Sequence, residues 1–302
     1  MRAPCGNGLL MDEGWAMKIN AAAIQMASVL RSPATNLERA ESLLKRARDR
    51  GVELAVLPEM FNTGYGLLDD FHPEAEERDG PTLKRLADLA QGWGMTIAAG
   101  FVEREGHHLY DSMALILPDR STHVYRKRHL VFWERFRFRP GRESIVVSTP
   151  FGRVGLAICA DMIYKRIWDG YRDRIDLALI SSAWPEFADT ATGRKHWLFG
   201  HVGPMSGEIP GLVARDLGIP VVFANQCGET QTVIPILTAR IRDRFAGRSC
   251  LSDGRHASTV IAGIEEAVVE SPLTIHAPRG PKSCHFMSSS APAASASVSE
   301  AG

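Results

Sequence analysis

An excess of charge of either sign is the first thing that this sequence lacks. Its 302 residues include 35 lysines and arginines and 35 aspartates and glutamates, so the formal net charge is zero. Such a chain has no overall field to attract nucleic acid or an anionic membrane surface. Long apolar runs are also missing, and none approaches the roughly 20 residues that a membrane helix needs. We therefore expect neither nucleic acid nor a membrane as a partner.

The sequence also has no CxxC pair, and its five cysteines are odd in number and widely scattered. This spacing supports neither a disulfide framework nor a zinc knuckle. Cys250 and His256 come nearest to a metal-ligand pair, but a site needs further ligands at close spacing, so we expect no metal. Unpaired cysteines are typical of a reducing compartment, and we predict a cytoplasmic protein.

Neither end of the chain has the sequence pattern of a folded domain. Residues 1–16 lack the long apolar segment of a signal peptide and precede a clear strand pattern, so we interpret them as an N-terminal extension. Residues 277–302 are rich in Ser, Ala and Pro and cannot bury enough surface to offset the entropy of ordering. We predict a disordered tail there and a single domain over residues 17–276.

What the sequence does contain is a regular alternation of helical and strand patterns. Apolar residues recur at helical spacing over 36–50, with Asn36 as the expected N-cap, and again over 81–92. Short apolar runs predict buried strands, the clearest being Leu54–Leu57, Thr96–Phe101, Val154–Ile158, Leu177–Ser181 and Val221–Ala224. This alternation predicts an α/β fold, in which reactive groups collect at the carboxyl ends of strands.

Two reactive side chains stand where predicted core strands end. Cys159 and Glu59 each follow an apolar run, and Lys127 lies between them in the sequence. A carboxylate within reach can take the proton of a thiol, which is mostly protonated at neutral pH. An ammonium can then stabilise the negative oxygen of a tetrahedral intermediate, helped by the backbone N–H of Ala160. These groups are what acyl transfer through a thioester needs.

Each of these residues also has an ordinary structural interpretation. A lone cysteine after a buried strand is usually an inert core residue. Glu59 can be a solvated turn residue. Lys127 belongs to a basic stretch over 126–139, which can be a solvated face or a phosphate-binding patch. Spacing alone leaves these alternatives open.

Three blocks of sequence carry a family resemblance, and their order and separations fit it. They are Leu57–Tyr65, Lys127–Glu134 leading to Pro140-Gly141, and Gly155–Asp161. Together they resemble the signature blocks of the nitrilase superfamily of carbon–nitrogen hydrolases, and the similarity extends from about residue 18 to residue 272. The resemblance implies a four-layer αββα sandwich without a cofactor, usually assembled into homodimers or larger homo-oligomers.

Carried over by position, the resemblance implies roles for four side chains. Cys159 becomes the nucleophile, Glu59 the general base and Lys127 the cation that stabilises the oxyanion. Glu134 matches a second glutamate that helps to position the substrate and the lysine, although an ion pair with a nearby arginine is the ordinary alternative. Aromatic residues close to these blocks are candidate walls of an apolar pocket for a small molecule: Tyr65, Trp133 and Trp184.

Departures from the family pattern narrow the reaction class. True nitrilases usually carry Trp-Glu directly after the nucleophile, whereas this chain has Ala160-Asp161. We therefore expect a thiol amidohydrolase that acts on a small linear amide or an N-carbamoyl compound and releases ammonia or an amine. The open alternatives are a nitrilase, an acyltransferase on the same fold, and a non-enzymatic assembly or binding protein.

Two further segments, residues 162–168 and 201–210, depart from the family pattern. We expect both to line the substrate pocket. We also expect residues 201–210 to differ from a regular helix.

Overall fold

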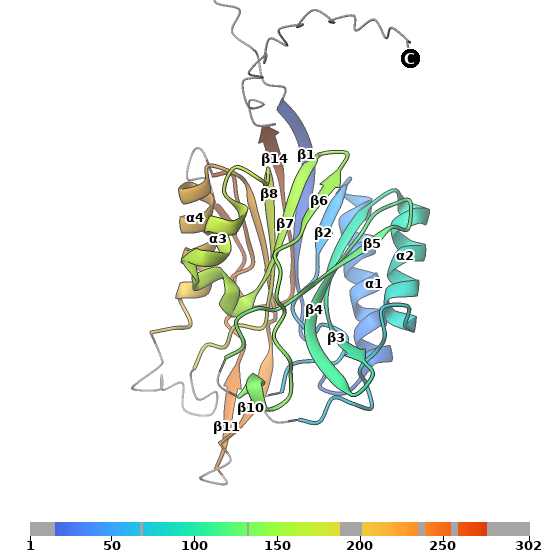
Figure 1. Ribbon diagram of the computed structural model, residues 1–302, viewed down its shortest axis with the longest axis vertical. Coiled ribbons are helices and arrows are strands. Elements are labelled where there is room, and N and C mark those ends of the chain that lie inside the picture. Colours follow the sequence, from blue (N-terminus) through green and yellow to red (C-terminus); the bar gives the residue numbers. More distant parts are fainter. Residues whose placement is uncertain are drawn as a thin grey trace, which may run out of the picture.

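Two six-stranded sheets face each other at the centre of the protein, and a pair of helices covers the outer face of each sheet (Figure 1). The computed structural model describes residues 16–66, 69–131, 133–187, 201–234, 239–254 and 259–276. Its arrangement is the four-layer αββα sandwich that the sequence predicts. The predicted tail and residues 1–15 of the predicted extension lie outside the described residues, and the first strand already includes Ala16.

The described residues form fourteen strands and four α-helices. The helices are α1 (Pro33–Asp49), α2 (Pro81–Trp93), α3 (Lys165–Tyr171) and α4 (Met205–Leu217). The strands are β1 (Ala16–Gln25), β2 (Leu54–Val56), β3 (Thr96–Glu105), β4 (His108–Ile116), β5 (Thr122–Arg126), β6 (Val146–Thr149), β7 (Gly152–Ile158), β8 (Leu177–Ser182), β9 (Val221–Asn225), β10 (Glu229–Ile234), β11 (Ala239–Arg244), β12 (Cys250–Ser252), β13 (Thr259–Ile261) and β14 (Ala267–His276).

Both sheets are mixed, with parallel strands in their centres. The first has the order β14-β1-β2-β3-β4-β5, and β1, β2 and β3 run parallel. The second has the order β13-β12-β9-β8-β7-β6, and β7, β8 and β9 run parallel. Strands β10 and β11 form a separate ribbon at one end of the sandwich (Figure 1).

Strand β1 shows how one segment builds two cores. Side chains of a strand point alternately to its two faces. Ala21 and Ala23 join the apolar core between the sheets, whereas Ala22 and Ile24 join the core beneath α1 and α2. Because both faces are buried, such central strands are apolar without interruption, which is why the sequence identifies them.

Helix α1 begins three residues before the predicted start, at Pro33. Proline suits this position because the first helical N–H groups have no partner within the helix. The prediction that Asn36 is the N-cap is wrong. Its fully buried side chain instead donates hydrogen bonds to the carbonyl oxygens of Val29 and Asn62, each at 2.7 Å. Asn36 thereby ties the helix to two loops.

Helix α4 corrects a second expectation. We expected residues 201–210 to differ from a regular helix: residues 201–204 do, since they form turns, whereas the residues from Met205 onward are helical. Pro210 lies inside the helix, where it cannot donate a backbone hydrogen bond. Its side chain belongs to the buried face of α4, and packing against the second sheet outweighs its low helix propensity.

No helix in the described part of the chain is long and apolar enough to cross a membrane.

Two candidate site residues follow parallel strands, one in each sheet. Glu59 follows β2 of the first sheet, and Cys159 follows β7 of the second. Gly100 on β3 makes room for Glu59. A Cβ at position 100 would lie 2.5 Å from the Cα of Glu59 and 2.7 Å from the Oγ of Ser181. Only glycine permits so close an approach.

We predict that Gly100→Ala lowers the free energy of unfolding by about 1–3 kcal/mol, because the added methyl meets backbone that cannot move aside. Urea denaturation measures this loss. Gly92→Ala in α2 is the matched control, since nothing lies within 4 Å of the added Cβ. That change is expected to be neutral or stabilising by up to about 1 kcal/mol. Equal stabilities of the two variants would contradict the close approach.

Candidate active site

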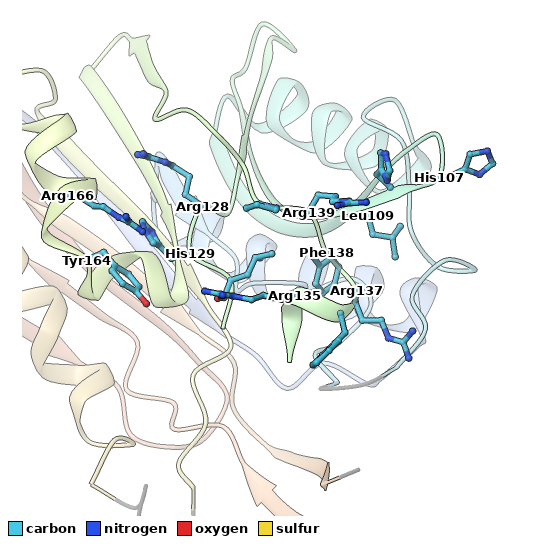
Figure 2. Close-up of a pocket in the computed structure, with 14 residues that line it drawn as sticks. His107, Leu109, Arg128, His129, Arg135, Arg137, Phe138, Arg139, Tyr164 and Arg166 are labelled. Carbon is cyan, nitrogen blue, oxygen red and sulfur yellow. The ribbon is translucent and has the colours of Figure 1, made fainter. Parts of the chain in front are cut away.

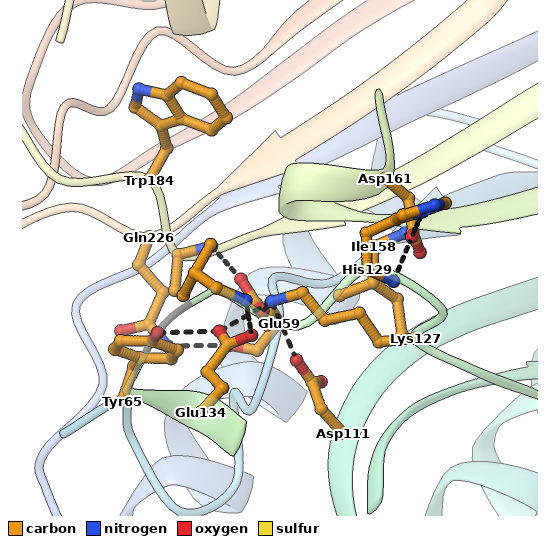
Figure 3. A network of polar contacts seen from close by, with 12 residues as sticks. Glu59, Tyr65, Asp111, Lys127, His129, Glu134, Ile158, Asp161, Trp184 and Gln226 are labelled. Atoms are coloured by element: carbon orange, nitrogen blue, oxygen red, sulfur yellow. Dashed lines mark hydrogen bonds and ion pairs between the residues drawn. The ribbon is translucent and has the colours of Figure 1, made fainter. Parts of the chain in front are cut away.

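Lys127 is the centre of a buried group of charges (Figure 3). Its ammonium donates hydrogen bonds to Oε1 of Glu59 at 2.6 Å and to Oε1 of Glu134 at 2.7 Å. Lys127 and Glu59 are fully buried, and Glu134 is almost so. Charges are tolerated at this depth only when they are paired. The structure thus brings together three of the residues that the sequence proposed for the site.

Glu59 is held from both sheets. Its Oε2 accepts a hydrogen bond from the N–H of Ala183, just after β8, at 2.6 Å. Its backbone carbonyl accepts another from the side-chain amide of Gln226, just after β9, at 2.7 Å. Both contacts come from the second sheet, whereas Glu59 follows a strand of the first. The carboxylate is therefore fixed at the interface between the sheets.

Glu134 lies in a short 3-10 helix, Glu134–Phe136, and links the charged group to aromatic side chains. Its Oε1 accepts a hydrogen bond from the Tyr65 hydroxyl at 2.7 Å, and its Oε2 accepts one from the Val131 N–H at 2.9 Å. The indole N–H of Trp133 donates in turn to the Tyr65 hydroxyl at 3.0 Å. Three predicted site residues therefore form one hydrogen-bonded chain.

Cys159 occupies the sharp turn at the end of β7, where a 3-10 helix, Cys159–Ile163, begins. Its φ is +45°, in the left-handed region that residues other than glycine seldom adopt. Met60, directly after Glu59, has a φ of +50°. Strained backbone of this kind persists only where the surrounding fold enforces it, and it clusters at functional sites. Cys159 thus lies in an enforced turn, and Glu59 directly precedes a residue in one.

The electrostatics of the site fix where the protons lie. Burial opposes the charge of Lys127, but Glu134, Glu59 and Asp111 together outweigh it and raise the pKa of Lys127 well above its usual value. Burial, and then the charge of Glu59, raise the pKa of the Cys159 thiol well above its usual value, although Lys127 opposes this. The resting thiol is therefore protonated and needs a base before it can react.

Asp111 belongs to the charged group, and the sequence analysis missed it. Its Oδ2 lies 3.2 Å from the Lys127 Nζ, and its side chain is buried. Burial, followed by the charge of Glu59, raises the pKa of Asp111 well above its usual value. A carboxyl group inside the apolar run Leu109–Leu117 was the available signal, because such groups are almost never buried without a partner.

Carboxylate oxygens of Glu59, Asp111 and Glu134 lie within 4.8 Å of one another, and among the described residues they form a cluster with the donor spacing of a cation site. The ammonium of Lys127 already contacts all three side chains. It supplies the positive charge that a metal ion would bring. This donor set therefore fits a site centred on lysine.

Asp161 holds the turn that carries Cys159. Its carboxylate accepts hydrogen bonds from the Tyr125 hydroxyl at 2.7 Å and from the His129 Nδ1 at 2.8 Å. Figure 3 shows Asp161 beside His129. The N–H of Ile158, just before the cysteine, also donates to it at 3.3 Å. The sequence analysis used Asp161 only as a marker of the reaction class. In the structure it joins the turn after β7 to strand β5 and the loop after β5.

The thiol of Cys159 opens into a cavity of about 220 Å³. The predicted wall residues Tyr65, Trp133 and Trp184 all line it, and so do Ala160 and Glu134. The rest of the described lining is mostly apolar: Val131, Ile163, Ala183, Pro185, Phe187, Val202, Thr230 and Phe245. Ile163 and Val202 come from the two segments that we expected at the pocket. Six of the predicted site residues thus line one small cavity, and Glu59 and Lys127 join them through the charged group that includes Glu134. Their catalytic roles remain predictions.

A family model described as carbon–nitrogen hydrolase matches residues 20–271 of this chain. A nitrilase of Pyrococcus abyssi is 35% identical over 150 residues, which cover 48% of this chain and 57% of the relative. An omega-amidase of Homo sapiens is 31% identical over 174 residues, which cover 54% of this chain and 61% of the relative. The chain therefore spans less than two thirds of the length of these two curated relatives.

Solved structures agree on the fold. A CN-hydrolase superfamily protein of Xanthomonas campestris superposes with a TM-score of 0.68 at 22% identity, covering 85% of this chain and 91% of that one. An amidase from Nesterenkonia sp. superposes with a TM-score of 0.68 at 19% identity, covering 87% of this chain and 93% of that one. At these identities the likeness shows the fold alone.

We predict that Asp111→Asn removes a pH-dependent loss of stability. Burial raises the pKa of Asp111 well above its usual value in the folded protein, whereas in the unfolded chain Asp111 loses its proton above an ordinary pKa of about 4. Folding then takes up a proton, so the free energy of unfolding falls as pH rises. The advantage of the variant over the wild type should grow between about pH 5 and about pH 8 in urea denaturation.

Asp119→Asn is the matched control, because its exposed carboxyl has its pKa lowered by hydrogen bonds from Ser121. It should show no such growing advantage. A difference between Asp111→Asn and the wild type that stays constant with pH would mean that Asp111 is ionised in the folded protein.

Proposed function

This chain belongs to the carbon–nitrogen hydrolase family, and on that premise we propose that it is an amidase for small, uncharged carboxamides. The observation that carries the proposal is the apolar cavity onto which the Cys159 thiol opens beside Glu134 and the buried Lys127 group. The omega-amidase among its relatives and the amidase among its structural neighbours support an amide substrate.

The reaction that we propose begins with Cys159 as a thiol. Glu59 takes its proton while the sulfur attacks the amide carbonyl, and the Lys127 ammonium and the Ala160 N–H stabilise the oxyanion. The C–N bond then breaks, and the leaving nitrogen takes the proton from Glu59 and departs as ammonia. Water that gives a proton to Glu59 hydrolyses the thioester, which releases the acid and restores the thiol.

Glu134 takes the positioning role in this scheme. It lines the cavity and binds Lys127, and its second oxygen is held by the Val131 N–H. A group fixed in this way keeps the ammonium directed at one place, where the oxyanion forms. Its bonds to Lys127 and Tyr65 favour this role over the ordinary alternative of an ion pair with an arginine.

The cavity lining favours an uncharged acyl group. Glu134 is the only charged side chain among the described lining residues, and Lys127 already pairs with it. A carboxylate on the acyl chain would lose its hydration there and find no free cation among those residues. The volume of about 220 Å³ is below the roughly 300–1,000 Å³ of sites for drug-sized ligands. We therefore favour a short aliphatic amide over an N-carbamoyl compound that carries a carboxylate.

Two amides of equal length test this specificity. We predict that kcat/KM for a four-carbon amide with a methyl end is at least about 100-fold higher than for the same chain ending in a carboxylate, since about 3 kcal/mol of uncompensated desolvation gives this factor. Ammonia release measures both rates. A carboxylate-ended amide that reacts equally fast or faster would contradict an apolar acyl site.

Replacement of the nucleophile tests the chemistry. We predict that Cys159→Ala lowers kcat by at least about 1,000-fold, because no thioester can form, while the thermal unfolding midpoint stays close to that of the wild type. Cys227→Ala is the control. Burial raises the pKa of Cys227 to about 12, and Cys227 does not line the cavity, so its removal should leave the rate unchanged. Full activity in Cys159→Ala would exclude the thioester route.

Nitrile hydrolysis is the second candidate, because one relative is named a nitrilase. The residues after the nucleophile, Ala160-Asp161, favour the amide instead. Ammonia released from a nitrile but not from the matching amide would favour the nitrilase.

Two further alternatives have their own signatures. An acyltransferase would be recognised by a product formed with an amine acceptor in place of water. A non-enzymatic assembly or binding protein would show no turnover at all.

Self-association and location remain proposals. We propose contacts between copies at the layer of α3 and α4, where apolar side chains are exposed, among them Ile163, Tyr164, Met205 and Leu212. Contacts between copies would remove these apolar side chains from water. A reducing, cytoplasmic location agrees with the free thiols of Cys159, Cys227 and Cys250.

A further inference from the structure

A second and larger cleft, of about 750 Å³, lies outside the catalytic cavity (Figure 2). Five arginines contribute to its lining, and no aspartate or glutamate of the described chain does: Arg128, Arg135, Arg137, Arg139 and Arg166. We refer to it as the arginine cleft. Five guanidinium groups around one opening form a concentrated positive charge in a protein whose net charge is zero.

The arginine cleft and the catalytic cavity share a wall but no lining residue. Leu130 and Arg135 line the cleft, whereas their neighbours Val131 and Glu134 line the cavity. The basic stretch over 126–139 thus has two functions on two sides. One side holds the catalytic group, and the other side presents arginines that the amidase scheme does not use.

Four arginines of the cleft, Arg128, Arg135, Arg139 and Arg166, are not neutralised by a carboxylate of the described residues. Arg128 donates to the Ser144 hydroxyl at 2.8 Å, and Arg135 donates to the Leu130 carbonyl at 3.3 Å. These partners are neutral, and none of these four arginines forms an ion pair with a described carboxylate. Arginines elsewhere differ: Arg126, for example, pairs with Glu103 and Glu105. Uncompensated like charges repel, so an anion bound among these side chains would stabilise the cleft.

Part of the cleft is already ordered for binding. Arg166 donates through Nε to the His129 Nε2 at 2.5 Å, and the His129 Nδ1 is bonded to Asp161. The His129 ring also stacks on Tyr164, with centroids 3.9 Å apart. Both ring nitrogens of His129 therefore have a partner, Arg166 at Nε2 and Asp161 at Nδ1. Arg166 is therefore held by a fixed partner and keeps its terminal N–H groups available for an anion.

We propose that the arginine cleft binds a small polyanion, a molecule with two or more phosphate or carboxylate groups. Planar guanidinium groups match both kinds of oxyanion with paired hydrogen bonds. Several arginines around one opening fit several anionic groups better than one. The volume of about 750 Å³ lies within the range of small-molecule sites. A nucleic acid would require a longer basic surface than this local cleft on a chain without net charge.

Titration calorimetry on the full chain tests the site with tripolyphosphate in one arm and citrate in the other. We expect one binding site per chain and an affinity that falls as salt rises from about 50 to about 200 mM. The anion that binds more tightly shows whether phosphate or carboxylate groups are preferred. Binding of either anion supports the site. The measurement is independent of the proposed amidase activity.

Variants locate the binding. Arg128→Gln and Arg139→Gln should each weaken the affinity at least 10-fold. The control Arg120→Gln removes the same charge from an exposed arginine that pairs with Asp88, and should leave the affinity unchanged. The Arg139→Gln protein should keep its thermal midpoint, because the structure gives that side chain no ion pair. Absence of binding in both arms, equal affinity in cleft and control variants, or binding of single-stranded RNA without binding of tripolyphosphate or citrate would overturn the proposal.

Discussion

The buried ammonium of Lys127 is the interaction on which the rest of the site depends. A lone charge at this depth would cost many kcal/mol, and the carboxylates around it would be equally unfavourable without it. Glu59, Asp111 and Glu134 approach from three different segments of chain, and each is held by a contact with the same Nζ. The site can therefore form only when the surrounding elements have folded around it, and its geometry is fixed by that condition.

The sandwich supplies the geometry by joining its two sheets at this point. Glu59 follows β2 of one sheet, yet its Oε2 and its carbonyl accept hydrogen bonds from Ala183 and Gln226 of the other. Gly100 lets β3 approach the backbone of Glu59 closely. Cys159 stands across the interface at the end of β7 in a strained turn. Base and nucleophile are thus positioned by packing between sheets, which is more rigid than either connecting loop alone.

The sequence predicted those features that a local pattern encodes. Uninterrupted apolar runs identified β7 and β8. The blocks around Glu59, Lys127 and Cys159 identified the buried charged group and the cysteine of the neighbouring cavity. Asp111 escaped because its meaning depends on Lys127, which is distant along the chain and adjacent only in the folded sheet. The start of α1 and the helical conformation of residues 205–210 were mispredicted for a related reason. Tertiary packing, as at Asn36 and within α4, overrides local propensity.

The central claim is that an acyl group passes through the sulfur of Cys159. Acid quenching during turnover of a short aliphatic amide, followed by peptide mass spectrometry, tests it most directly. The account predicts that the peptide containing Cys159 gains the mass of the acyl group, while the peptides containing Cys227 and Cys250 remain unmodified. Turnover without an adduct at any quench time, or an adduct on another residue, would contradict it.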